Sequence, residues 1–242
     1  MKNYAKILFL LIPAVAFLVS GCGGGGGGGG GPTGSVASTR TFSLAQATGF
    51  FLGRSHTINY TLTGSQGSTS FTGSGTITID AATGATFEGQ QALSQTLSIT
   101  GTVTGNGKTV PYAKTATSYY TTNYNGLGDE TAGSYCVATS PIIEPTSVKV
   151  GDTANEGVED CYSDNTKNTK TEIDYGSYVM EPDTADTAIV NFITNSYTTR
   201  NVQLSSSQER WRLDLYNVPI FVSLSYSDYT TSPATILTFT AN

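Results

Sequence analysis

Apolar and polar residues alternate with a period of two along most of the chain after residue 56. Between Thr57 and Leu62, Ile, Tyr and Leu alternate with Thr and Asn, and a Gly- and Ser-rich turn follows at 64–68. The alternation resumes from Phe71 to Ile79. This period is typical of β-strands that bury one face, and two such runs around a short turn predict a β-hairpin.

The same pattern predicts further strands up to the C-terminus. Two of them, around Leu97–Val103 and Val110–Tyr112, flank an Asn-Gly turn. Others are expected at 147–150, 158–162, 173–180, 188–197, 202–204, 210–216, 220–226 and 235–240. The alternation places one set of apolar residues on a single face of each of two C-terminal strands, namely Trp211, Leu213 and Leu215 on the first and Val222, Leu224 and Tyr226 on the second.

One short helix is expected between Thr41 and Phe51. Ser43 can cap its N-terminus, Leu44, Ala47 and Phe51 would share one face, and Gly49 could end it.

About ten to thirteen strands joined by short turns predict an all-β fold, an antiparallel meander that forms a sandwich or a curved half-barrel. At most one short N-terminal helix accompanies it. The β-rich domain is expected at 41–242, either as one unit or as two halves, 41–125 and 130–242. An integral outer-membrane barrel would show the same alternation, but polar and charged residues on both strand faces argue against it.

The N-terminal residues have the pattern of an export signal. Lys2 and Lys6 precede an apolar run from Ile7 to Val19, which ends in Val-Ser-Gly-Cys at Cys22. This ending resembles the lipobox of bacterial lipoproteins. The resemblance implies that residues 1–21 are a cleaved signal peptide and that Cys22 becomes an N-terminus acylated with chains such as palmitate.

A glycine-rich segment follows the cysteine. Gly23–Gly31 is an unbroken run, and 22–40 as a whole is expected to be a flexible tether that spans about 20–25 Å. In enterobacterial lipoproteins Asp after the cysteine retains the protein at the inner membrane, so Gly23 implies an outer-membrane location by resemblance. Whether the domain faces the periplasm or the outside stays open.

The charge distribution excludes one class of partner and highlights one segment. The chain has 18 acidic and 12 basic residues, and two of the basic ones lie in the signal. An acidic protein is a poor match for nucleic acid. Residues 129–186 contain 13 acidic and 3 basic residues. We interpret this segment as a solvated, loop-rich face; a divalent-cation site or a basic partner is the alternative.

Cys136 and Cys161 remain as an even pair once Cys22 is assigned to the lipid anchor. In an exported protein such a pair predicts a disulfide. A metal site or a catalytic thiol is disfavoured, because neither CxxC spacing nor a neighbouring histidine accompanies these cysteines.

The sequence gives little support for any known catalytic motif. His56 is the only histidine, and no Gly-x-Ser-x-Gly elbow or phosphate loop occurs. A hydrolase that uses carboxylates alone, for example among Glu156, Glu159 and Asp160, is the remaining enzymatic alternative. We therefore expect no enzymatic activity and no cofactor.

Two further groups are candidates for binding. Asp160, Asp164 and Asn165 offer oxygen ligands for calcium, as do Asp183 and Asp186 on another turn, although solvated turns would have the same composition and the EF-hand spacing is not met. Tyr119, Tyr120 and Tyr124 lie among Thr and Asn, a composition that suits contact with a sugar or a protein. Tyrosines that simply line strand faces are the alternative.

Together these features predict a non-catalytic cell-envelope lipoprotein. Its β-rich domain would be held at a membrane by the acyl anchor and would act in binding or structure. The alternatives are a carrier of an apolar ligand or lipid in a half-barrel cavity, and a surface adhesin or glycan-binding module. The partner, whether protein, glycan or lipid, is not indicated by the sequence.

Overall fold

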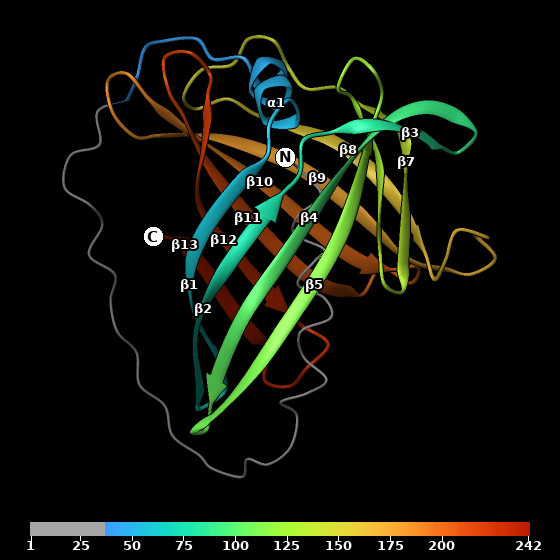
Figure 1. The fold of residues 1–242 in the computed structure, drawn as a ribbon, viewed down its shortest axis with the longest axis vertical. Coiled ribbons are helices and arrows are strands. Elements are labelled where there is room, and N and C mark those ends of the chain that lie inside the picture. The colour runs from blue at the N-terminus through green and yellow to red at the C-terminus, as the bar shows by residue number, and fades with distance from the viewer. Residues whose placement is uncertain (1–36) are drawn as a thin grey trace.

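The computed structural model describes residues 37–242, which contain one helix and thirteen strands (Figure 1). The predicted signal peptide, the predicted acylation site Cys22 and most of the predicted tether lie outside the described residues. The elements are α1 (Leu44–Leu52), β1 (His56–Gln66), β2 (Thr69–Ile79), β3 (Thr83–Phe87), β4 (Gln90–Gly105), β5 (Lys108–Tyr120), β6 (Gly126–Thr131), β7 (Ser134–Ile142), β8 (Thr153–Tyr162), β9 (Lys170–Pro182), β10 (Ala188–Thr198), β11 (Gln203–Leu213), β12 (Pro219–Asp228) and β13 (Thr235–Ala241).

The strands form a closed antiparallel barrel. Each strand pairs with its neighbours in the chain, except that β1 pairs with β13 and β2 pairs with β4. These two contacts close a ring of twelve strands, to which β3 adds a short hairpin on β4. The prediction of an all-β antiparallel meander is confirmed, but the sheet is neither a sandwich nor a half-barrel, because β4 is long enough to pair with β3 along its first part and with β2 along the rest. Strands from 41–125 and from 130–242 belong to this single sheet.

The predicted helix is present, and its N-cap is as expected. The Ser43 hydroxyl accepts a hydrogen bond from the Gln46 amide (3.1 Å), and Leu44, Ala47 and Phe51 are buried. The helix continues through Gly49 to Leu52, so the expected end at Gly49 is wrong. Burial of Phe51 and Leu52 favours the extra turn, while a Cβ at Gly49 would lie 3.3 Å from the Tyr124 ring.

α1 lies across one end of the barrel, which we call the helix end (Figure 1). The carbonyl of Pro145, between β7 and β8, accepts hydrogen bonds from the Leu44 and Ala45 amides. The side chain of Asn217, between β11 and β12, accepts one from the Ser43 amide (2.9 Å). Two connections thus hold the first turn of α1.

Three sequence predictions of strands need correction. The segment 147–150 is not a strand, because Val148 makes only an isolated bridge to Phe42 and a turn follows. The segments 202–204 and 210–216 form parts of one strand, β11. That strand ends at Leu213, so Leu215 is exposed in the next turn.

A bulge in β12 changes which side chains face the interior. Arg210 pairs with Ser223 and Trp211 pairs with Phe221, so Val222 is an extra residue in β12. The predicted shared face of Val222, Leu224 and Tyr226 is therefore wrong: Phe221 is buried with Leu224 and Tyr226.

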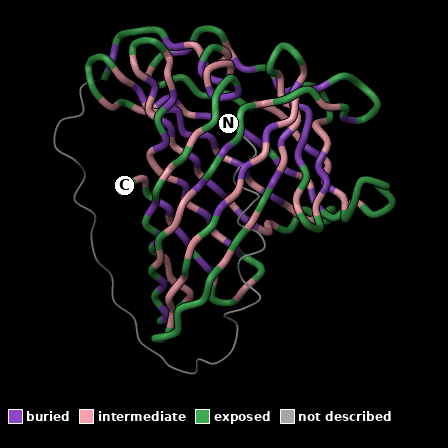
Figure 2. The backbone as a smooth tube through the Cα atoms, in the orientation of Figure 1, coloured by how far each residue is buried: buried purple, intermediate pink, exposed green. Residues whose placement is uncertain are grey.

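Buried and exposed residues alternate along the barrel strands (Figure 2). The largest hydrophobic cluster fills the space between α1 and the inner faces of β1, β2, β4 and β10–β13. A smaller cluster around Phe87 and Tyr135 attaches the β3 hairpin. No helix within residues 37–242 is both long and apolar enough to cross a membrane.

Candidate functional site: the interior of the barrel

Four carboxylate side chains from β6, β8 and β9 face the inside of the barrel. Asp129 is 0 % exposed, Asp174 is 2 %, Glu159 is 5 % and Glu172 is 9 %. The strand register places Glu159 opposite Asp174, and it places Glu172 opposite Cys161. We call these four residues the acidic wall.

The acidic wall revises the interpretation of the segment 129–186. This segment is not a loop-rich, solvated face, because it forms most of the four strands β6–β9. In β9, Glu172 and Asp174 share the face of Tyr178 and Met180, which belong to the core. Other acidic residues of the segment point outward and pair with cations: Asp160 with Lys170, Glu181 with Arg210, and Asp183 with Arg212.

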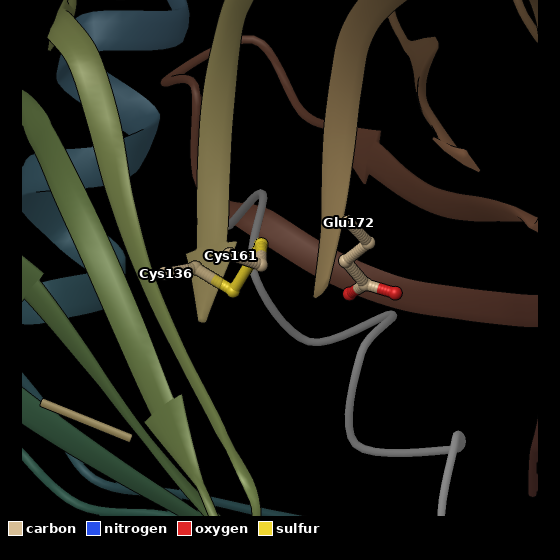
Figure 3. Close-up of side chains that lie close together, drawn as sticks. All are labelled: Cys136, Cys161 and Glu172. Atoms are coloured by element: carbon tan, nitrogen blue, oxygen red, sulfur yellow. A yellow bond between two sulfur atoms is a disulfide. The ribbon is translucent and has the colours of Figure 1, made fainter. Parts of the chain in front are cut away.

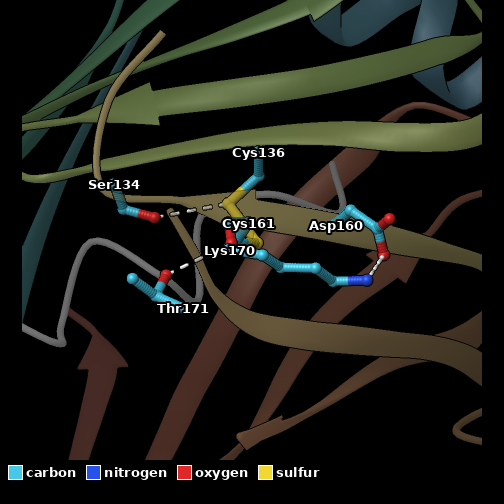
Figure 4. The surroundings of a disulfide bond; sticks show 6 residues. All are labelled: Ser134, Cys136, Asp160, Cys161, Lys170 and Thr171. Carbon is cyan, nitrogen blue, oxygen red and sulfur yellow. Dashed lines mark hydrogen bonds and ion pairs between the residues drawn. A yellow bond between two sulfur atoms is a disulfide. The ribbon is translucent and has the colours of Figure 1, made fainter. Parts of the chain in front are cut away.

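A disulfide lies in the middle of the acidic wall (Figure 3). The predicted bond between Cys136 and Cys161 is present; both cysteines are fully buried, and they lie directly opposite each other on β7 and β8. The Ser134 hydroxyl donates toward Cys136 Sγ (3.3 Å), and the Thr171 hydroxyl donates to the Cys161 carbonyl (3.2 Å) (Figure 4). The bond fixes the relative position of two strands that carry the wall.

Glu172 completes a close trio with the two cysteines. One ligand atom from each residue lies within 4.8 Å of the others. A metal ion binds cysteine as the thiolate, and both sulfur atoms here are used in the disulfide. The trio is therefore not a metal site in this oxidised state.

The opposite side of the interior is apolar. Below α1, a small cavity is lined by side chains of β1, β2, β4, β11 and β12, namely Ile58, Ile77, Ile79, Leu97, Ile99, Glu209, Trp211, Phe221 and Leu224. All of these except Glu209 are hydrophobic. Phe51 of α1 contacts Trp211 edge-to-face, with 4.9 Å between ring centroids, so the helix covers this region.

Glu209 is a buried carboxyl group in this apolar environment. It is 2 % exposed, and its Oε1 accepts a hydrogen bond from the Trp211 indole nitrogen (2.6 Å). Its Oε2 accepts no hydrogen bond from the described residues. Burial raises the pKa of Glu209 to about 8, an effect larger than the opposing one of the indole hydrogen bond.

Tyrosine hydroxyls also point into the interior. The Tyr60 and Tyr112 hydroxyls are hydrogen-bonded to each other. Burial raises the pKa of both groups, and for Tyr112 the contact with Tyr60 raises it further. Both therefore remain neutral hydroxyls that can donate or accept.

Small residues occupy a band of inward positions between the wall and the apolar side. Across β8, β9, β10 and β11, the register aligns Gly157, Gly176, Thr194 and Ser207 in one row. The next inward positions on β10 and β11 are Ser196 and Ser205, both buried. These side chains extend little into the barrel.

The structure separates the three candidate tyrosines. Tyr119 stacks on Phe87 with 4.3 Å between ring centroids, and its hydroxyl donates to Glu130 (3.2 Å). Tyr120 is buried, whereas Tyr124 is 42 % exposed. Because Tyr119 and Tyr120 face opposite sides of β5, the three rings form no common platform.

The calcium candidates are likewise apart. Asp160 pairs with Lys170 (2.7 Å), and Asp164 accepts hydrogen bonds from the Thr166 amide and hydroxyl, which lower the pKa of Asp164. Asn165 is exposed. On the other turn, Asp186 pairs with Arg40 (2.8 Å) and Asp183 with Arg212. Within residues 37–242 these acids do not converge on a shared ligand position.

The candidates for catalysis lie on different strands: His56 on β1, and Glu156, Glu159 and Asp160 on β8. His56 stacks on Phe51, and its Nε2 donates to the Phe51 carbonyl (3.1 Å). Glu159 faces the interior, whereas its neighbour Asp160 points outward to Lys170.

Sequence reasoning missed the acidic wall and Glu209. They could have been found from the strand face on which they lie, because residues at even spacings along a strand share a face. Glu172 and Asp174 lie at even spacings from Tyr178 and Met180, and Glu209 lies two residues before Trp211. Comparisons with models of protein families, with curated proteins and with solved structures gave no match to this chain.

Proposed function

We propose that the chain is a non-catalytic lipoprotein of the cell envelope that holds a ligand inside its barrel. The observation that carries this proposal is the two-sided interior, with the acidic wall facing apolar side chains. Ligand sites in proteins are typically apolar with a few placed polar groups, and a carboxyl group with a strongly shifted pKa in such a place is a candidate for function.

The width of the barrel supports a ligand inside it. A barrel of about eight strands is just filled by its own side chains, and the diameter grows with the number of strands. This barrel has twelve strands in its ring. The row of inward residues Gly157, Gly176, Thr194 and Ser207 carries small side chains, which favours room for a ligand across part of that width.

The rarity of buried carboxyl groups supports the same conclusion. Asp and Glu are seldom found in a protein core, and where they are buried they have a partner. Inward carboxyl groups on three strands therefore favour a role in binding.

The outer face of the barrel supports an anchor separate from the fold. Thr61, Thr72, Thr100 and Thr115 are exposed on the outside of β1, β2, β4 and β5. Hydroxyl side chains suit contact with water, so attachment to the membrane would rest on the acyl chains at Cys22. The proposed location is the outer membrane.

The anchor can be tested by metabolic labelling with an alkyne analogue of palmitate. We expect the wild-type chain to take up the label and Cys22→Ser to take up none. Cys136→Ser is the matched control and should remain labelled, because it retains Cys22. The Cys161 thiol that it leaves unpaired is buried inside the barrel. Label retained in Cys22→Ser, or absent from the wild type, would contradict the anchor.

Binding inside the barrel can be tested with a variant whose larger side chain occupies the interior. Trp211 is the only tryptophan and lies beside the interior cavity, so its fluorescence reports on a guest. The mature chain, secreted with Cys22→Ser through an ordinary signal, would be titrated with dodecanol. We expect a saturable change in emission, and Ser207→Phe should weaken it at least about tenfold, which corresponds to about 1.4 kcal/mol of binding energy.

The neighbouring residue on the same strand provides the control. Ser206 points outward, and Ser206→Phe should leave the titration unchanged. Equal binding by both variants would place the ligand elsewhere and would contradict a site inside the barrel.

A further inference from the structure

We propose that the ligand is an organic cation, an amine or related group on an apolar body, selected by the inward carboxyl groups. This inference rests on the proposed function, because it specifies the class of ligand that the interior of the barrel accepts.

The charges that face inward are predominantly negative. The acidic wall contributes Asp129, Glu159, Glu172 and Asp174, and Glu209 adds a fifth carboxyl group. Of the lysines and arginines in the part of the chain that the structure describes, Lys108 and Lys114 on β5 are in phase with the inward residues Tyr112 and Ala116; Lys108 is exposed at the start of the strand and Lys114 is half-buried. Lys170 lies two residues before Glu172 on β9, but it pairs with Asp160, which points outward. Such an interior attracts cations and repels carboxylates and phosphates.

Glu209 is an independent indication of a ligand that carries hydrogen-bond donors. Its Oε1 is held by Trp211, and its Oε2 faces an apolar cavity without a donor among residues 37–242. A buried acceptor without a donor costs free energy, which an N–H group of a ligand would recover. An ammonium next to Glu209 would favour the ionised carboxyl group against the effect of burial, and the hydrogen bond between the two would then be one of the stronger, charge-assisted kind.

The rest of the interior fits the apolar body of such a ligand. Ile77, Ile99 and Phe221 line the cavity next to Glu209. The wall on β8 and β9 lies on the other side of the small-residue band at Thr194 and Ser207. A molecule with one charged end and one apolar end therefore meets both of its requirements inside the same barrel.

The test compares three probes that share a dodecyl chain and differ in the head group: dodecylamine, dodecanol and dodecanoate. Each is titrated below its critical micelle concentration into the secreted mature chain, with Trp211 fluorescence as the readout. We expect the amine to bind at least about tenfold more tightly than the alcohol, and the carboxylate to bind most weakly.

Variants of the wall identify the source of the selectivity. The double variant Glu172→Gln/Asp174→Asn should bring the amine within about threefold of the alcohol and leave the affinity for the alcohol unchanged. The matched control is Asp160→Asn/Asp164→Asn, which removes two carboxylates from the outside and should preserve the preference for the amine. Thermal unfolding of each variant verifies that the barrel is intact.

The outcomes separate this inference from the proposed function. If dodecanol or dodecanoate binds as tightly as the amine, and Ser207→Phe blocks all of them, the barrel binds a ligand but does not select cations. If the preference persists in the double variant, the assignment to the wall is wrong. If none of the probes gives a saturable change, both proposals fail.

Discussion

Glu209→Gln is expected to abolish a large part of the decrease in stability that the wild-type protein undergoes as the pH rises from about 4.5 to about 8. The ordinary pKa of a glutamate is 4.5, and burial raises that of Glu209 to about 8. Between these values the native state holds a proton that the unfolded chain releases. The free energy of unfolding therefore decreases as the pH rises, by up to about 1.4 kcal/mol per pH unit.

Glu209 changes the free energy of unfolding only within a defined pH range. Below the unfolded pKa, both states are protonated and the full stability is present; above the folded pKa, the loss is complete and the curve becomes flat. A glutamine has no proton to lose, and its amide oxygen can still accept the Trp211 hydrogen bond. If the whole shift is expressed, the variant should avoid a loss of about 5 kcal/mol that the wild type undergoes between acidic and alkaline pH.

Urea unfolding at several pH values between about 5 and 9 measures this difference. The acidic wall also titrates, so the informative quantity is the difference between wild type and Glu209→Gln at each pH. Glu130→Gln, which makes the same chemical change on an exposed residue, is the control. Parallel curves for wild type and Glu209→Gln would show that Glu209 does not carry the shifted proton equilibrium.

The strands could be predicted because their signal is local. Alternation in β1, β2 and β9–β13 reflects one buried face, and each strand pairs with a neighbour in the chain. Closure of the ring had no such signal. It depends on pairs such as Ile79 with Leu97, which skip the β3 hairpin, and a half-barrel would have the same alternation up to that point.

Part of the candidate site was missed because the inward and outward faces of the strands were not separated in the acidic segment. Counting acidic residues in 129–186 identified an unusual segment, but it did not separate inward Glu159 from outward Asp160. The bulge at Val222 exchanged the faces of two apolar residues, which alternation alone does not predict. The disulfide could be predicted because the expected acylation of Cys22 leaves Cys136 and Cys161 as an even pair.

Gly75→Ala is expected to destabilise the barrel by more than about 4 kcal/mol, in the range of severe core mutations, or to prevent folding. Gly75 on β2 lies directly opposite Gly101 on β4, in the pair that closes the ring. A Cβ at Gly75 would lie 2.0 Å from the Thr100 carbonyl oxygen and 2.5 Å from the Tyr60 hydroxyl. Because the nearest of these atoms belongs to the backbone, it cannot move aside without breaking the pairing of β2 with β4.

Gly84→Ala is the matched control, since a Cβ there would meet no atom within 4 Å. It should leave the free energy of unfolding unchanged or raise it by less than about 1 kcal/mol, because alanine restricts the unfolded chain. Urea unfolding compares both variants with the wild type, and soluble yield replaces it if Gly75→Ala does not fold. A Gly75→Ala protein within about 1 kcal/mol of the wild type would mean that β2 and β4 do not meet there. The two-sided interior exists only when β2 pairs with β4. The same variant should therefore also lose the saturable change in Trp211 fluorescence on titration with the ligand.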